Sequence, residues 1–182
     1  MRSALVAALF LVLAALPAAA RQDDPRLKDL FDDLQNAKTT TESRIVEQRI
    51  WRIWGEDGNA QIDALMELGA NAMQAGDLDA ALDTFNRVVA LDDSFAEGFN
   101  KRATVEFMQG NYDASVADIE RTLKLEPRHF GALSGLGQIY LALNDKPAAL
   151  RAFEAALKVN PHLTGAADMV AKLKKELAGK PT

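Results

Sequence analysis

The sequence predicts an all-α protein, an α-solenoid in which helix hairpins stack side by side. The first observation is self-similarity at a fixed period of 34 residues across the middle of the chain, which indicates stacked repeats. The second is composition, because alanine and leucine dominate and the alternation of β-branched residues typical of strands is scarce. The third is the placement of glycine, asparagine and proline at equivalent points of successive periods, where helices must end.

Residues 1–20 predict a signal peptide for export. Arg2 precedes an uncharged apolar run from Ala4 to Leu16, and small residues follow as far as Ala20, which is the pattern that signal peptidases cleave. The run is shorter than the roughly 20 apolar residues of a spanning helix, so cleavage after Ala20 is favoured over a retained membrane anchor. We therefore expect a periplasmic mature protein without stable membrane insertion.

Composition limits the classes of function. Cleavage would remove Arg2 from the 21 basic residues and none of the 26 acidic ones, leaving a net charge of −6. Such a chain is a poor partner for nucleic acid, whose phosphates attract a basic face. The sequence contains no cysteine, so disulfide bonds and thiolate metal ligands are excluded. The remaining length suits one domain with its own core.

Residues 21–61 predict a degenerate N-terminal helix hairpin followed by a joint. Extending the 34-residue register backward places Leu34 on a leucine position, and it places Trp51 and Trp54 where a second helix buries its bulk. We interpret both tryptophans as core side chains against the first repeat, with the hairpin capping the front of the solenoid. An exposed aromatic docking surface is the alternative interpretation.

Residues 62–163 divide into three units, 62–95, 96–129 and 130–163. In each unit a small residue lies where the second helix crosses the first closely, and a residue that tolerates positive φ lies in the turn between them. Proline ends the second and third units, because it cannot continue a helix. The small residues are Gly69, Ala103 and Gly137, the turn residues are Gly76, Gly110 and Asn144, and the prolines are Pro127 and Pro161.

With this pattern, residues 62–163 resemble three tetratricopeptide repeats, and segment 125–137 also resembles small exported bacterial repeat proteins without assigned activity. The resemblance implies a scaffold that binds a protein or peptide on the concave face, which the first helix of each repeat lines. Some members of the family bind a terminal carboxylate with a basic clamp. That clamp is absent here, because its positions hold Met66, Ala70, Lys101, Gly131 and Gly135.

Two further features concern structure. Arg102 resembles a family variant that carries arginine where leucine is usual, and Asp118 faces it from the second helix. We expect these two to form a structural bidentate ion pair, because a charge inside a solenoid needs a partner. Residues 164–182 predict a capping helix and a frayed tail, with the outer face of the helix rich in lysine.

The repeat register assigns twelve residues to a partner-binding groove. Methionine and phenylalanine accept varied apolar partners, so we expect an apolar anchor near Met73 and Phe107. Gly131 and Gly135 also face this groove, and we expect them to let a partner backbone approach closely. The assigned residues are Asp63, Met66, Glu67, Met73, Asn100, Lys101, Thr104, Phe107, Met108, Ser134, Gly135 and Gln138.

No residue pattern predicts a catalytic, metal or cofactor site. His129 and His162 lie in successive inter-repeat turns, without carboxylates at metal-ligand spacing. The alternative function, an enzyme or enzyme subunit acting on cell-wall material with the solenoid as substrate cradle, depends on Asp63 and Glu67, one helical turn apart. We expect instead a non-enzymatic periplasmic adaptor that binds a protein or peptide of the cell envelope and supports envelope integrity or assembly. Self-association through the concave face or the lysine-rich cap is a third hypothesis.

Overall fold

The computed structural model describes residues 21–179, and all regular structure within that range is helical. This confirms the predicted all-α fold class. The predicted signal peptide, residues 1–20, lies outside the described residues, so its cleavage stays a prediction. The helices are α1 (Arg26–Asn36), α2 (Thr40–Gly55), α3 (Ala60–Ala75), α4 (Leu78–Leu91), α5 (Ala96–Met108), α6 (Tyr112–Leu125), α7 (Phe130–Ala142), α8 (Lys146–Val159) and α9 (Thr164–Ala178).

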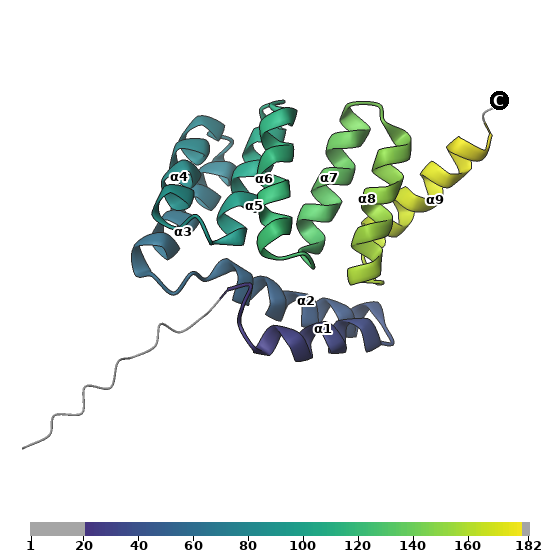
Figure 1. The fold of residues 1–182 in the computed structure, drawn as a ribbon, viewed down its shortest axis with the longest axis horizontal. Helices are drawn as coiled ribbons and strands as arrows, with labels where there is room; N and C mark the ends of the chain where they lie inside the picture. The colour runs from purple at the N-terminus through teal and green to yellow at the C-terminus, as the bar shows by residue number, and fades with distance from the viewer. Residues whose placement is uncertain (1–20, 180–182) are drawn as a thin grey trace, which may run out of the picture.

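The three repeats are the hairpins α3–α4, α5–α6 and α7–α8, which stand side by side in Figure 1. The second helix of the first and third repeats begins at an aspartate that caps it. Asp77 accepts a hydrogen bond from the Ala80 backbone N–H at 3.1 Å, and Asp145 accepts one from the Ala148 N–H at 3.0 Å. Such caps satisfy backbone donors that a helix start otherwise leaves unpaired.

Close packing within a hairpin depends on the predicted small residues. A Cβ atom added at Gly69 would lie 2.6 Å from Cζ of Phe85, and one added at Gly137 would lie 2.7 Å from Cζ of Phe153. Any side chain at either position would therefore push the phenylalanine of the second helix away. The turns also behave as predicted, because Gly76, Gly110 and Asn144 have φ values of 77°, 80° and 58°.

The N-terminal hairpin, α1 and α2, does not stack in front of the first repeat. Figure 1 shows it lying across one end of the repeat helices. The front of the first repeat is left uncovered. Leu68 on α3 is 53% exposed, whereas its counterpart Leu136 packs against the core between the second and third repeats. The predicted position of this hairpin as a front cap was therefore wrong.

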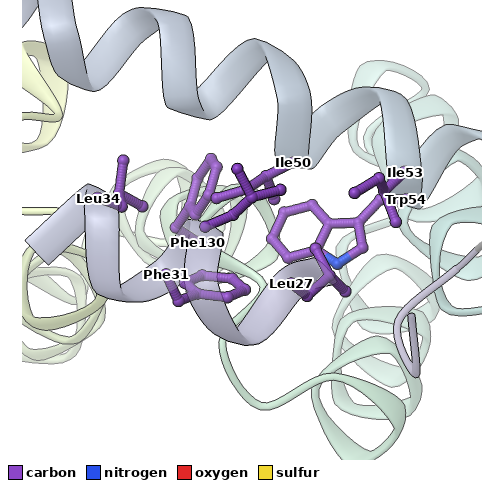
Figure 2. Close-up of a cluster of buried hydrophobic side chains, with 8 residues drawn as sticks. Leu27, Phe31, Leu34, Ile50, Ile53, Trp54 and Phe130 are labelled. Atoms are coloured by element: carbon purple, nitrogen blue, oxygen red, sulfur yellow. The ribbon is translucent and has the colours of Figure 1, made fainter. Parts of the chain in front are cut away.

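The two tryptophans accordingly pack against the turn between the second and third repeats, and not against the first repeat. Figure 2 shows Trp54 and Phe31 of the hairpin gathered with Phe130, the first residue of α7. Trp54 is 1% exposed, so the prediction that it is a core side chain was right. The prediction that it packs against the first repeat was wrong. The register counts positions along the chain, but the direction of the next element depends on the joint after α2. There Gly58 has a φ of 87°, a conformation that glycine adopts without strain.

The N-terminal hairpin and the residues before it contact all three inter-repeat turns. At the first turn, Arg21 forms an ion pair with Asp92, and the Gln22 side-chain amide donates to the Ser94 carbonyl at 2.6 Å. At the second turn, the Arg128 guanidinium lies 4.2 Å from the centroid of the Phe31 ring, a distance at which a cation and an aromatic face attract each other.

The third turn has the largest number of polar contacts with this hairpin. Gln35 Nε2 donates to the Val159 carbonyl at 2.5 Å, and His162 Nε2 donates to the Ala37 carbonyl at 2.9 Å. Asn160, which is fully buried, donates to the Glu47 carboxylate. The hairpin thus joins repeats that in a simple solenoid would contact only their neighbours.

The far end of the array is covered by α9, which packs against α8 as a capping helix. Leu173 of α9 is 1% exposed and lies in a cluster with Phe153. Two ion pairs join the two helices at their surface, Lys146 with Glu176 at 2.6 Å and Lys174 with Glu154 at 2.8 Å. The predicted capping role of this helix is confirmed.

Candidate functional site: a groove between the N-terminal hairpin and the repeats

A groove runs along the first helices of the three repeats, with α2 as a wall at both ends. It consists of three neighbouring clefts. Glu97 of the first cleft is hydrogen-bonded to Asn100 of the second, with 2.9 Å between the Asn100 Nδ2 and Glu97 Oε2 atoms. Gln138 lines both the second cleft and the third. We call them the acidic cleft, the apolar pocket and the α9 cleft.

The acidic cleft lies between the end of α2 and helices α3 and α5, with a volume of about 660 Å³. Four carboxylates and one ammonium group line it, so its net charge is negative. Trp51 and Met66 supply its apolar surface. Its lining residues are Trp51, Gly55, Glu56, Asp63, Met66, Glu67, Glu97 and Lys101.

The apolar pocket opens between α5, α6 and α7, with a volume of about 230 Å³. Gly135 stands at its wall, and a Cβ atom added there would lie 3.6 Å from Cδ1 of Ile119. Because Gly135 has no side chain, the pocket has space for a side chain of a partner, and none of the described residues that line it is charged. The pocket is lined by Asn100, Ala103, Thr104, Phe107, Ser115, Ile119, Gly135, Gln138 and Ile139.

The α9 cleft lies between α2, α7 and the start of α9, with a volume of about 490 Å³. Here Arg44 and Glu47 offer opposite charges. Burial raises the pKa of Glu47, although the hydrogen bond from Asn160 and the charge of Arg44 oppose that rise. The lining residues are Thr40, Ser43, Arg44, Glu47, Ser134, Gln138, Phe153, His162, Leu163, Thr164, Gly165 and Ala166.

Most of the residues assigned to the groove from the sequence lie in these clefts. Met73 and Met108 line none of the three. Met73 packs against the core of the first repeat, whereas Phe107 lines the apolar pocket. The apolar anchor expected near these two residues stays a prediction. The residues found in place are Asp63, Met66, Glu67 and Lys101 in the acidic cleft, Asn100, Thr104, Phe107, Gly135 and Gln138 in the apolar pocket, and Ser134 in the α9 cleft.

Gly131 does not have the role expected for it. A Cβ atom added at Gly131 would lie 2.5 Å from Cη2 of Trp51, so the space beside this glycine is filled by the N-terminal hairpin. No partner backbone is needed to explain it. Gly135 remains the one of the two that leaves space open.

A buried polar network behind the acidic cleft was missed. Glu97 and His129 are 2% and 0% exposed, and the His129 Nε2 atom lies 2.9 Å from Glu97 Oε2. His129 Nδ1 accepts a hydrogen bond from the Ala132 backbone N–H at 3.1 Å, which caps α7. Since Nδ1 accepts, the ring proton is on Nε2, and a neutral imidazole donates it to the carboxylate.

Burial opposes ionisation of Glu97, yet its pKa is lowered. The hydrogen bond from His129, the charge of Lys101 and the hydrogen bond from Asn100 together outweigh the desolvation. The Lys101 ammonium lies 3.2 Å from Glu97 Oε1. The sequence held one signal for this site. Glu97 occupies the same position of the 34-residue register as Asp63 and Gly131, both of which were assigned to the groove face, so the register also places Glu97 on that face.

The predicted ion pair of Arg102 and Asp118 is present and bidentate, with N–O distances of 2.6 and 2.7 Å. Arg102 also donates to the Asn86 side chain at 2.9 Å. Glu106, one turn further along α5, has a carboxylate oxygen that is buried without a hydrogen-bond partner. Burial and the nearby Asp118 carboxylate raise the pKa of Glu106, against the attraction of Arg102. These contacts are structural and lie outside the three clefts.

Several kinds of chemistry have no support among residues 21–179. No group of three or more histidine, aspartate or glutamate side chains could hold a metal ion there. In the same range, no helix combines the length and apolarity needed to cross a membrane. Asp63 and Glu67 share the acidic cleft, but Asp63 accepts a hydrogen bond from the Asp57 N–H at 2.8 Å.

Comparison with known sequences places the repeats in a family. Two models, both described as tetratricopeptide repeat, match residues 63–93 and 100–164. The chain is 35% identical over 164 residues to a TPR repeat-containing protein of Rhizobium etli. That match covers 90% of this chain and 80% of the relative.

Solved structures agree on the fold. The first TPR of Spaghetti bound to an HSP90 peptide has a TM-score of 0.63 at 22% identity, covering 66% of this chain and 97% of that one. The type III secretion chaperone SycD of Yersinia enterocolitica, in complex with a peptide of the translocator YopD, has a TM-score of 0.62 at 15% identity. It covers 65% of this chain and 95% of that one. Since the repeat models and the Rhizobium relative both match, this chain belongs to the tetratricopeptide repeat family.

Proposed function

We propose that this protein is a scaffold that binds a segment of another protein in the groove between α2 and the repeats. The carrying observation is the succession of three neighbouring clefts along the first helices of the repeats, which offer charged, apolar and polar surface in turn. Elongated grooves of this kind suit an extended chain, whose side chains can enter successive pockets. Binding of HSP90 and YopD peptides by the two structural neighbours supports this use of the fold.

We also propose a cellular location and a biological role for the protein. The signal-peptide pattern of residues 1–20 favours export to the periplasm, where the partner would be a protein of the cell envelope and the role would be envelope integrity or assembly. Mass spectrometry of the protein purified from the periplasmic fraction tests the first step. A mature chain beginning at Arg21 agrees with it, and an intact chain beginning at Met1 in the cytoplasmic fraction contradicts it.

Photocrosslinking in intact cells tests the groove itself. A photoreactive residue replaces Thr104, which is exposed and lines the apolar pocket. The matched control carries it at Ala117, which is exposed on α6 of the same repeat and lines none of the three clefts. We expect a defined protein adduct from Thr104 and none from Ala117. Equal adducts from both positions, or none from Thr104, would argue against the groove.

A further inference from the structure

We infer that the groove selects a cationic protein segment, with lysine or arginine side chains in the acidic cleft and one apolar side chain in the apolar pocket. This inference rests on the proposed function, because it specifies the partner of the same groove. Among the described residues, neither Asp63 nor Glu67 takes part in an ion pair. Their negative charges are therefore available to a ligand.

Lys101, the one cationic side chain among the described residues that line the acidic cleft, does not cancel these charges. Lys101 is 3.2 Å from Glu97, a carboxylate that is fully buried and ionised because its pKa is lowered. The lysine therefore balances Glu97, and the charge of Arg26 acts on Glu56. Asp63 and Glu67 remain to set the sign of the field. A basic side chain entering this cleft gains Coulomb attraction that an acidic one would lose.

The same geometry disfavours an anionic chain end. Of the five positions that would carry a basic clamp, only Lys101 is basic, and it is engaged with Glu97. Gly131 is covered by Trp51, and Gly135 opens the apolar pocket. A terminal carboxylate would find no free cation at these positions.

The apolar pocket supplies the second requirement. Its volume of about 230 Å³ and its walls of Phe107, Ile119 and Ile139 suit the side chain of one leucine, methionine or phenylalanine. Asp63 and Glu67 lie on α3, whereas the pocket opens between α5 and α7. Packed helices lie about 10 Å apart, and an extended chain rises about 3.3 Å per residue. The basic and apolar residues of the partner should therefore be about three to six residues apart.

Selection from random peptides displayed on phage tests this inference without assuming a partner. The mature protein, residues 21–182, is the bait. We expect the selected peptides to share a lysine or arginine and an apolar residue at that spacing, without a need for a free carboxyl end. A synthetic peptide of the selected sequence should bind less tightly as ionic strength rises, because salt screens charges near the surface.

Two variants assign the parts of the motif. The double variant Asp63→Asn, Glu67→Gln should weaken binding of the selected peptide at least about fivefold and lose the basic preference in a repeated selection. Gly135→Leu should fill the pocket and remove the apolar preference. Urea unfolding of each variant establishes that it is folded before it is used.

The outcomes separate the inference from the proposed function. Selected peptides that are acidic, or a basic preference that persists in the double variant, would overturn the cationic partner and leave a protein-binding groove. Selection of no peptide above the background of uncoated plates would contradict both. Peptides selected equally by the wild type and by the combined triple variant would show binding at another surface, which also contradicts both.

Discussion

The imidazole of His129 stacks on the indole of Trp54, with ring centroids 4.2 Å apart and the two planes inclined by 11°. Both side chains are fully buried. His129 also caps α7 and donates to Glu97 on α5. One side chain therefore joins the N-terminal hairpin to the first helices of the second and third repeats.

Trp54→Ala should destabilise the protein by about 3–5 kcal/mol, because it leaves a large cavity and uncovers the imidazole. The midpoint of urea unfolding, followed by circular dichroism, measures this change. Ile45→Ala is the control, because Ile45 is on the same helix and is 56% exposed. It should change the free energy of unfolding by less than about 0.5 kcal/mol. Equal effects of the two changes would mean that the stack is not a major contribution.

Two glycines of α7 should respond in opposite directions to alanine. Gly131→Ala places a Cβ atom 2.5 Å from the Trp51 ring, and moving that ring should cost about 1–3 kcal/mol. Gly135→Ala meets Ile119 at an ordinary 3.6 Å, so the higher helix propensity of alanine should stabilise the protein by about 1 kcal/mol. Thermal unfolding of both variants measures the two changes in stability. A stabilised Gly131→Ala variant would show that Trp51 moves without cost.

Glu97 should contribute to stability at neutral pH and lose that contribution in acid. Its pKa is lowered from the usual 4.5, so the folded state releases this proton more readily than the unfolded state does. The contribution is present above pH 4.5 and is lost as the pH falls through the lowered pKa. Glu97→Gln should therefore be less stable than the wild type at neutral pH by about 2 kcal/mol. The difference should shrink in urea titrations carried out below pH 4.5. A difference that stays constant with pH would contradict this.

Glu106 should behave in the opposite sense. Its pKa is raised from 4.5, so the stability it allows is present below that pH and is lost as the pH rises through the raised pKa. Glu106→Gln should stabilise the protein at neutral pH and leave it unchanged in acid. The gain should stay below about 1 kcal/mol, because water reaches part of the side chain. A loss of stability at neutral pH would mean that the ionised carboxylate has a role in the fold.

The repeats could be predicted because their signals are local and periodic. Gly69 and Gly137 need a small residue for the crossing phenylalanine, and Gly110 needs a positive φ. Each requirement repeats every 34 residues, so the alignment of the chain with itself was enough to predict the solenoid. The groove residues followed from the same register, because the first helices of all three repeats face one side.

The position of the N-terminal hairpin could not be predicted in this way. It depends on contacts between residues far apart in sequence, such as Gln35 with Val159 and Trp54 with His129. No periodic signal marks such pairs, and the register placed the hairpin by its spacing alone. For the same reason the sequence did not predict that α2 lines the groove, or that Glu97 would find a histidine from the next repeat.

The contacts of α2 with the second and third turns fix the length of this part of the array. Helix α2 has 16 residues and is therefore about 24 Å long, and a helix cannot stretch. Trp54 near its end meets the second turn, while Ser43 near its start meets Asn160 of the third. A repeat inserted between these turns would break one of the two contacts. Because both contacts lie at fixed positions along α2, the number of repeats between them is part of the fold.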